Sequence, residues 1–353
     1  MAIFINGAQA ISPQNTFLSK SIPIELKEYS SLMKNILPNF KDYFNPLEMR
    51  RMSDIIKTST TTAIECLKET NIDKIDAVIT GTGQGCLEDT EKFLNKMLEN
   101  NEEFLTPTSF IQSTHNTFGA HVALISKCNG HNINYVHKTI SFESALLDAI
   151  LLIKECKAKN ILVGGVDETT QRHYENKKLI SECKEEPFSN LDIYGSNASG
   201  VIPGEGTTFF LLSDEKQYNT YAELKMLDFT YKLKEGMELS QYIESRLKSS
   251  ELSLNEIDLV LFGFNGDKDT DKYYHQIKDT LFINQDHAYY KHYCGEFDTA
   301  SAFGLWIATR IIKESIVPDT LIIGERKKTA IKNVLLYNQD NNRNHTITVI
   351  AAC

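Results

Sequence analysis

Short apolar runs alternate with stretches of helical periodicity along the chain, and this alternation predicts an α/β architecture. In the first half we expect strands at Ile3–Ile5, Ala77–Thr80, Asn132–His137, Ile161–Val166 and Thr207–Leu212, and helices near 50–70, 88–100, 115–127 and 141–157. In the second half we expect strands near 221–230, 257–264, 320–324, 333–337 and 346–351, and helices near 236–249, 269–281 and 299–315. The polar stretch Ser213–Gln217 predicts a surface loop, so we divide the chain into segments 1–215 and 216–353.

The helix predicted at 141–157 has the clearest pattern. Its wide apolar stripe consists of Phe142, Ala145, Leu146, Ala149, Ile150 and Ile153, broadened by Leu147, Leu151 and Leu152. Such a helix is buried on most sides. It follows a predicted strand, and a turn of this kind is where many acyl-transfer enzymes keep a cysteine nucleophile, because the aligned amides stabilise an anion. Here the turn contains Thr139 and Ser141 and no cysteine.

Composition and charge narrow the functional classes. The chain has 353 residues and a net charge of −10 without a long run of Lys or Arg, which argues against nucleic-acid binding. Its seven cysteines are scattered and form no CxxC pair, so we expect a reducing cytoplasm, no disulfides and no metal site. Met1–Gly7 reads as a first strand, not as a signal peptide. No apolar run approaches the roughly 20 residues that span a bilayer. We therefore expect a cytoplasmic protein with no membrane span and no cofactor.

Several short motifs follow one another in order along nearly the whole chain. They are Ile5–Pro13, Arg50–Ser53, Gly81–Gly85, Gly164–Asp167, Pro187–Phe188 with Gly204–Gly206, and Lys291 with Gly295. Together they resemble the β-ketoacyl synthase family, which has the thiolase fold. The sequences of Ser113–Thr117 and Ser141–Glu143 are most similar to the corresponding segments of small synthase-like proteins from bacterial aryl-polyene and flexirubin pigment pathways. The resemblance implies two pseudo-symmetric βαβ halves that form a five-layer αβαβα sandwich.

The resemblance also implies where the catalytic residues of a working synthase would lie. Such an enzyme uses a thiolate to take the acyl chain, two neutral histidines to polarise the thioester carbonyl, and a nearby lysine. Family spacing puts the cysteine position at Thr139, the first histidine position at Asn265 and the second at Glu296. The lysine is retained as Lys291. All three reactive positions therefore hold other residues, and we expect no active catalytic group among them.

Each replacement removes a chemical capability. The hydroxyl of Thr139 is ionised roughly 100,000-fold less than a thiol at neutral pH. Asn265 donates a hydrogen bond but cannot shuttle a proton. Glu296 carries negative charge where carbonyl polarisation needs a donor, and a salt bridge to Lys291 would be its natural structural role. The glycine–phenylalanine gating motif of the family is also missing, since Asn338–Asn344 stands in its place.

These replacements suggest a non-catalytic ketosynthase-like subunit, similar to a chain length factor. It would form a heterodimer with an active β-ketoacyl synthase and shape the acyl tunnel for polyene, polyketide or fatty-acid-type chains on an acyl carrier protein. A second hypothesis is an independent thioester-processing enzyme with Ser141 or Thr139 as nucleophile and His137 or His115 as base, and a third is a scaffold homodimer. Since the chain and such carriers are both acidic, we expect the main docking patch on the partner. Minor contributors would be Arg50, Arg51, Arg326, Lys327 and Lys328.

Other motifs have a structural interpretation beside the functional one. The glycines in Gly81–Gly85 lack dinucleotide-binding spacing, which favours a plain turn. Asp267–Asp271 suggests a calcium loop but lacks the required glycine and glutamate, which favours a solvated loop or a helix cap. For Ser141 an N-cap role is favoured, and for Cys294 packing is favoured over reactivity. For the aromatic segment Tyr289–Tyr293, core packing and tunnel lining are both open.

Overall fold

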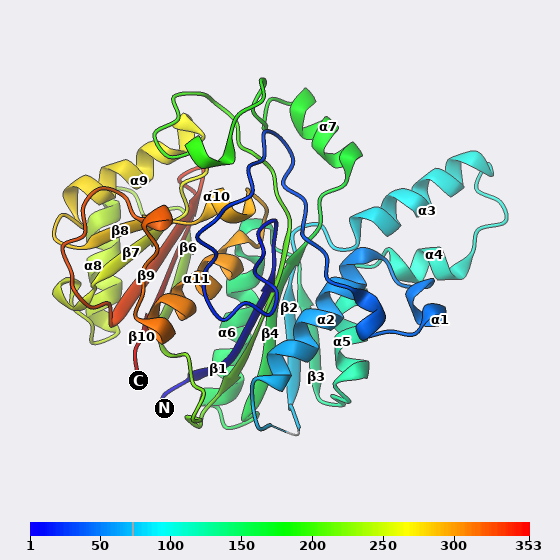
Figure 1. Ribbon diagram of the computed structural model, residues 1–353, viewed down its shortest axis with the longest axis horizontal. Coiled ribbons are helices and arrows are strands. Elements are labelled where there is room, and N and C mark those ends of the chain that lie inside the picture. The colour runs from blue at the N-terminus through cyan, green and yellow to red at the C-terminus, as the bar shows by residue number, and fades with distance from the viewer. Residues whose placement is uncertain (73) are drawn as a thin grey trace.

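The protein is described by a computed structural model that covers residues 1–72 and 74–353 (Figure 1). Its strands are β1 (Phe4–Ile11), β2 (Ala77–Gly81), β3 (His131–Tyr135), β4 (Asn160–Asp167), β5 (Gly206–Ser213), β6 (Ala222–Tyr231), β7 (Leu259–Phe262), β8 (Asp286–Tyr289), β9 (Asn333–Asp340) and β10 (Asn344–Ala351). They are hydrogen-bonded in the order β3-β2-β4-β5-β1-β6-β10-β9-β7-β8.

The two halves of this sheet repeat one topology. In the first half β5 runs antiparallel to β1 and β4, and β2 runs parallel to β4 and β3. In the second half β10 runs antiparallel to β6 and β9, and β7 runs parallel to β9 and β8. The halves meet where Phe4 and Ile5 of β1 pair with Glu223 and Ala222 of β6. This repeat confirms the predicted pseudo-symmetry. The division at residue 215 falls between β5 and β6 and stays a prediction as a domain boundary.

Helices lie between and outside the two half-sheets (Figure 1). They are α1 (Pro46–Met49), α2 (Asp54–Lys68), α3 (Leu87–Glu99), α4 (Pro107–Gln112), α5 (Thr117–Ile125), α6 (Ser141–Lys154), α7 (Gln171–Leu179), α8 (Leu239–Ser249), α9 (Lys268–Thr280), α10 (Lys291–Cys294) and α11 (Ala300–Glu314). Apolar side chains of α2 and α5 pack on the outer face of the first half, and those of α8 and α9 on the outer face of the second. With α6 and α11 in the centre, the five predicted layers are confirmed.

The central helices α6 and α11 form the apolar middle of the molecule. The stripe predicted for α6 is buried, as its periodicity required. α11 is buried continuously from Ala300 to Ile312 and packs against strands of both halves. The 3-10 turn that leads into α6 and the first turn of α11 line the same cavity, so the core packing also positions the candidate site.

Most predicted elements are confirmed, but one predicted strand is wrong. The run at 320–324 starts as a 3-10 turn and then makes only an isolated bridge between Ile322 and Ala288. The strand at this edge of the sheet is β8, which we did not predict because Asp286–Tyr289 contains no continuous apolar run. We also did not predict α4 and α7, which bury no residue and therefore carry no core-facing pattern.

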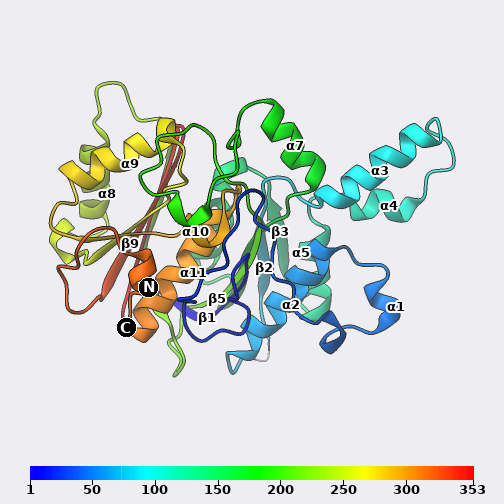
Figure 2. The same ribbon diagram turned by 45° about the horizontal axis from the view of Figure 1, so that its top comes forward.

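The two edges of the sheet differ in their protection. At the β8 edge, the backbone N–H of Ile323 donates to the His287 carbonyl oxygen at 2.8 Å, and that of Lys327 to Asp286 Oδ1 at 2.6 Å. At the other edge, β3 pairs only with β2 among the described residues, and its side chains are exposed or half-buried. The hairpin of α3 and α4 projects from the body on the same flank as β3 (Figures 1 and 2).

None of the helices described combines the length and apolar character that a membrane crossing requires.

Candidate functional site

A cavity of about 660 Å³ opens at the N-terminal end of α6. Its wall is formed by the turn before α6, the β9–β10 hairpin, the loop after β7 and the segment around α7, among others. Thr139, Asn265, Lys291 and Glu296 all line it. The structure therefore brings together, from both halves of the chain, the four positions that the sequence singles out.

Thr139 is held in a tight turn before α6. Lys138 has a left-handed backbone with a φ of 51°, and a short 3-10 turn covers Lys138–Ile140. The Ser141 hydroxyl accepts from His137 N and donates to the Lys138 carbonyl oxygen, each at 2.7 Å. The Thr139 hydroxyl oxygen accepts from Asn344 Nδ2 at 3.1 Å. These contacts hold the backbone turn in place and orient the Thr139 hydroxyl toward the β9–β10 hairpin.

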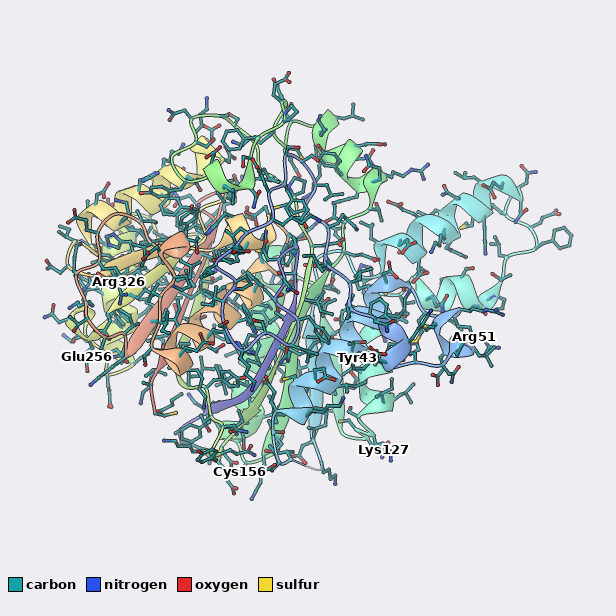
Figure 3. The ribbon with its side chains drawn as sticks, viewed as in Figure 1. Tyr43, Arg51, Lys127, Cys156, Glu256 and Arg326 are labelled. Atoms are coloured by element: carbon teal, nitrogen blue, oxygen red, sulfur yellow. The ribbon has the colours of Figure 1, made fainter. Side chains whose placement is uncertain are left out.

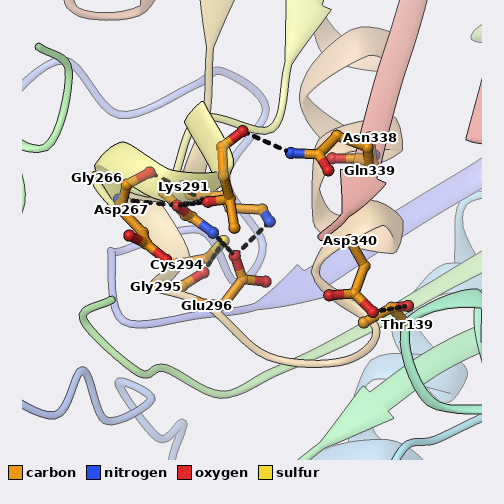
Figure 4. Close-up of polar contacts among 12 residues, drawn as sticks. Thr139, Gly266, Asp267, Lys291, Cys294, Gly295, Glu296, Asn338, Gln339 and Asp340 are labelled. Carbon is orange, nitrogen blue, oxygen red and sulfur yellow. Dashed lines mark hydrogen bonds and ion pairs between the residues drawn. The ribbon is translucent and has the colours of Figure 1, made fainter. Parts of the chain in front are cut away.

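Glu296 is the centre of the second cluster (Figure 4). Its Oε2 accepts from Lys291 Nζ at 2.6 Å and from Asn265 Nδ2 at 2.7 Å. The Asn265 Oδ1 in turn accepts from Asp267 N and Thr270 Oγ1. The predicted Lys291–Glu296 salt bridge is confirmed. Because the carboxylate satisfies both donors, the cluster is a closed network within the wall of the cavity.

The hairpin between β9 and β10 occupies the place of the missing gating motif. Asn341 and Asn342 have φ values of 48° and 54°, and Arg343 N donates to the Asp340 carbonyl oxygen at 2.8 Å, so they form a type I′ turn. Asparagine tolerates this left-handed backbone better than most residues. The turn brings Asp340 Oδ2 to 3.4 Å from the Thr139 hydroxyl, as Figure 4 shows. A carboxylate therefore faces the position where a nucleophile would stand.

Buried carboxyl groups make the surroundings of the cavity poorly suited to further negative charge. Burial raises the pKa of Glu143, in the first turn of α6, to about 7 although Ser301, Thr346 and Lys291 oppose the shift. Burial also raises the pKa of Asp340, with Glu296 adding to the effect. The negative charge of these carboxyl groups would destabilise a thiolate or oxyanion formed at residue 139, whereas catalytic thiolates are stabilised by positive surroundings.

The Glu143 carboxyl predicts a specific pH dependence. Its folded-state pKa lies above the unfolded value of 4.5, so its contribution to stability is present below pH 4.5 and is lost as pH rises through about 7. We expect Glu143→Gln to match the wild type at pH 5 and to be about 2 kcal/mol more stable at pH 8. Denaturant unfolding at both pH values measures this. Parallel pH profiles for the two proteins would contradict the assignment.

The structure disfavours the candidates for an independent hydrolase. Ser141 is fully buried and its hydroxyl donates to a backbone carbonyl. It is the first residue of α6, which Ile140 precedes, so the predicted N-cap role is wrong: its hydroxyl bridges the preceding turn instead. His115 and His137 are exposed and do not line the cavity. The histidine that does line it is His173 on α7, whose pKa is lowered mainly by burial and which the sequence did not single out.

Most remaining motifs have structural roles. The Asp267 side chain accepts from Asp269 N and caps α9, as predicted. Cys294 is fully buried, and burial raises the pKa of its thiol, so packing is its role. In Gly81–Gly85 the backbone passes so close to α6 and Asp298 that side chains at Gly81 and Gly83 would collide with them. The aromatic segment lies in the core, and of its aromatic rings that of Tyr290 lines the cavity. Within the described residues, no group of three or more His, Cys, Asp or Glu could hold a metal ion.

The basic residues considered for carrier docking do not form one patch. Arg51 and Arg326 lie on opposite flanks of the molecule (Figure 3). Arg50 and Arg51 follow α1, whereas Arg326, Lys327 and Lys328 belong to the segment that covers β8.

Comparisons with known proteins agree with this geometry. Residues 33–187 match the family described as "Beta-ketoacyl synthase, N-terminal domain". No match was found among curated proteins. The resemblance inferred from the motifs is thereby confirmed for that part of the chain.

Solved structures extend the likeness to the whole chain at the level of the fold. A β-ketoacyl synthase from Burkholderia phymatum is 15% identical with a TM-score of 0.80, covering 100% of this chain and 99% of that one. The ishigamide ketosynthase/chain length factor is 14% identical with a TM-score of 0.80, covering 100% and 99%. A ketosynthase in complex with its chain length factor from Xenorhabdus doucetiae is 15% identical with a TM-score of 0.76, covering 100% and 98%.

Proposed function

Since residues 33–187 match the β-ketoacyl synthase N-terminal domain and the whole chain has the thiolase-like ketosynthase fold, we propose that this protein is a non-catalytic ketosynthase-like subunit. It pairs with an active β-ketoacyl synthase, in the manner of a chain length factor, and shapes the space for a chain carried on an acyl carrier protein. Two of the similar structures contain a chain length factor, which supports this role. Synthesis of an aryl-polyene or related chain is proposed from the resemblance of Ser113–Thr117 and Ser141–Glu143.

The observation that carries the proposal is the composition of the cavity. At the three positions where a synthase needs a thiol and two imidazoles stand Thr139, Asn265 and Glu296. The carboxylate of Glu296 is bound to Lys291 and Asn265, and Asp340 faces Thr139. No thiol or imidazole stands at these three positions, and the 3.4 Å contact from the Thr139 hydroxyl to Asp340 is longer than proton transfer requires, so the arrangement supports a role other than condensation.

The flank along β3 supports pairing with a second protein. β3 is an open edge strand, and open edges pair readily with other chains. Exposed apolar side chains surround it: Ile133 and Val136 at the strand, Leu124 and Ile125 on α5, and Leu151 on α6. The opposite edge, β8, is covered by its own chain. An uncovered edge with an apolar border is the arrangement expected of a subunit interface.

The proposal predicts that the chain is inactive alone and that its complex does not use Thr139. We expect the purified chain to release no CO₂ from a malonyl-loaded carrier protein. We expect a co-expressed synthase to co-purify with it and the complex to condense acyl and malonyl thioesters. Thr139→Ala should change the rate of the complex by less than about twofold, because its hydroxyl is no nucleophile. Condensation by the chain alone, unaffected by Thr139→Ala, would refute the proposed function.

We also expect the carrier protein to dock mainly on the partner. Reversing the charges of Arg50, Arg51, Arg326, Lys327 and Lys328 to glutamate should change the affinity of the complex for the carrier by less than about threefold. Arg51 and Arg326 lie on opposite flanks of the molecule (Figure 3), so the residues do not form a single docking patch. Fluorescence anisotropy with a labelled carrier measures this, and a tenfold loss would contradict the prediction.

A further inference from the structure

The chain contains three Asn–Gly pairs, at Asn6–Gly7, Asn129–Gly130 and Asn265–Gly266. In such a pair the backbone nitrogen of the glycine can attack the side-chain amide carbon of the asparagine, because glycine has no Cβ to obstruct the approach. The attack needs an amide side chain that can rotate and a glycine N–H that is not held in a hydrogen bond. The three pairs differ in both respects.

Two of the pairs are restrained by the fold. Asn6 is fully buried in β1, and its Nδ2 donates to the Glu215 carbonyl oxygen at 2.9 Å. Gly266 N donates to Asp271 Oδ2 at 2.9 Å, and the Asn265 side chain is held in the cavity-wall network described above. Neither asparagine can turn its amide carbon toward the following nitrogen without breaking these bonds.

The pair at Asn129 has no such restraint. It lies in the exposed turn between α5 and β3, and both of its residues are exposed to water. Within residues 1–72 and 74–353, no hydrogen bond engages the Asn129 side chain or Gly130 N. The turn therefore leaves both reacting groups unhindered.

We propose that Asn129 is a site of spontaneous deamidation that yields isoaspartate. Gly130 N attacks Asn129 Cγ and closes a succinimide ring, the Cγ–Nδ2 bond breaks, and ammonia leaves with the proton of the Gly130 N–H. Water then adds to one carbonyl carbon of the ring. Opening at the main-chain carbonyl gives isoaspartate, and opening at Cγ gives aspartate. Either product carries a carboxylate in place of an amide. The inference goes beyond the proposed function and does not depend on it.

Isoaspartate lengthens the backbone by one methylene group immediately before β3, where space is lacking. A Cβ on Gly130 would lie 1.9 Å from the Asp76 carbonyl oxygen, and the next residue, His131, pairs with Ala77 of β2. The Asp76 side chain also accepts from Asn160 N at 3.0 Å, at the start of β4. The added group therefore displaces the first pairing of β3 with β2 and disturbs this edge of the sheet.

Peptide mapping by mass spectrometry tests the proposal on the full chain, incubated in mildly alkaline buffer in its folded form and in its guanidinium-unfolded form. In the folded chain Asn129 should deamidate at least about tenfold faster than Asn6 and Asn265. In the unfolded chain the three rates should lie within about threefold of one another, because only the shared Asn–Gly sequence then acts. An isoaspartyl methyltransferase should methylate the incubated wild type at least about tenfold more than Asn129→Ser. Equal rates at the three sites of the folded chain, or equal methylation of the two proteins, would overturn the assignment.

The effect on β3 has its own measurement. The isoaspartate form, separated by ion exchange, should melt at a Tm about 2 °C or more below that of the wild type. Asn129→Asp is the matched control, because it adds the same charge without the methylene group, and its Tm should stay within about 1 °C of the wild type. An isoaspartate form that melts together with Asn129→Asp would refute the displacement of β3. Neither measurement uses a partner or a carrier protein, so failure here is distinct from failure of the proposed function.

Discussion

Replacing Leu124 and Val136 together by aspartate is expected to abolish association with the partner synthase. Leu124 on α5 is 74% exposed and Val136 after β3 is 48% exposed, so both changes leave the fold of the chain intact. In an interface along β3 the new carboxylates would be buried without partners, which costs at least about 3 kcal/mol and lowers the affinity roughly 100-fold or more. Co-purification and analytical ultracentrifugation of the mixed subunits measure the loss.

A matched control separates this effect from general loss of apolar surface. Ile283 and Ile316 are also exposed, at 57% and 60%, but Ile283 lies on the β8 flank and Ile316 follows α11. Their replacement by aspartate should leave association within about threefold of the wild type, since the β8 edge is already covered by its own chain. If both double variants still form the complex, or if the control alone loses it, the partner-binding face is not the β3 flank.

Lys291→Met is expected to destabilise the chain by about 3 kcal/mol. The lysine side chain is 7% exposed and Glu296 is 21% exposed, so the pair is largely shielded from water. Removing the ammonium group leaves a carboxylate with Asn265 as its remaining donor, and an uncompensated buried charge is costly. Guanidinium unfolding at pH 7 measures the change.

Two further variants define the cause of that loss. Lys291→Met with Glu296→Gln removes both charges and keeps an acceptor for Asn265, so it should recover at least half of the lost stability. Lys157→Met breaks an exposed pair with Glu155 and should leave the free energy of unfolding unchanged within experimental error. If the double variant is no more stable than Lys291→Met, the effect comes from packing and not from the charge of Glu296.

Much of the fold could be predicted from the sequence because its core elements carry strong patterns. α6 has an apolar stripe that fits a helix buried on most sides, and β4 and β5 are continuous apolar runs. The apolar pattern did not predict β8, because this strand is buried by neighbouring segments and is not itself a continuous apolar run. The apolar periodicity did not predict α7 either, because this helix has no buried residue and therefore no apolar face.

The candidate site could be predicted only in part. Motif spacing brought Thr139, Asn265, Lys291 and Glu296 to the same cavity, and charge alone indicated the Lys291–Glu296 pair. Asp340 and His173 could not be found in this way, since they reach the cavity through the β9–β10 turn and through α7, neither of which has a recognisable spacing to Thr139. The signal for Asp340 was the Asn341–Asn342 pair, which favours a tight hairpin.

The continuous burial of α11 has a consequence for how the molecule unfolds. One helix supplies apolar contacts to strands of both repeats, so neither repeat keeps a complete core after the other has melted. Heat or denaturant should therefore melt the chain in a single cooperative transition, and a fragment cut at residue 215 should remain largely unstructured until its complement is added.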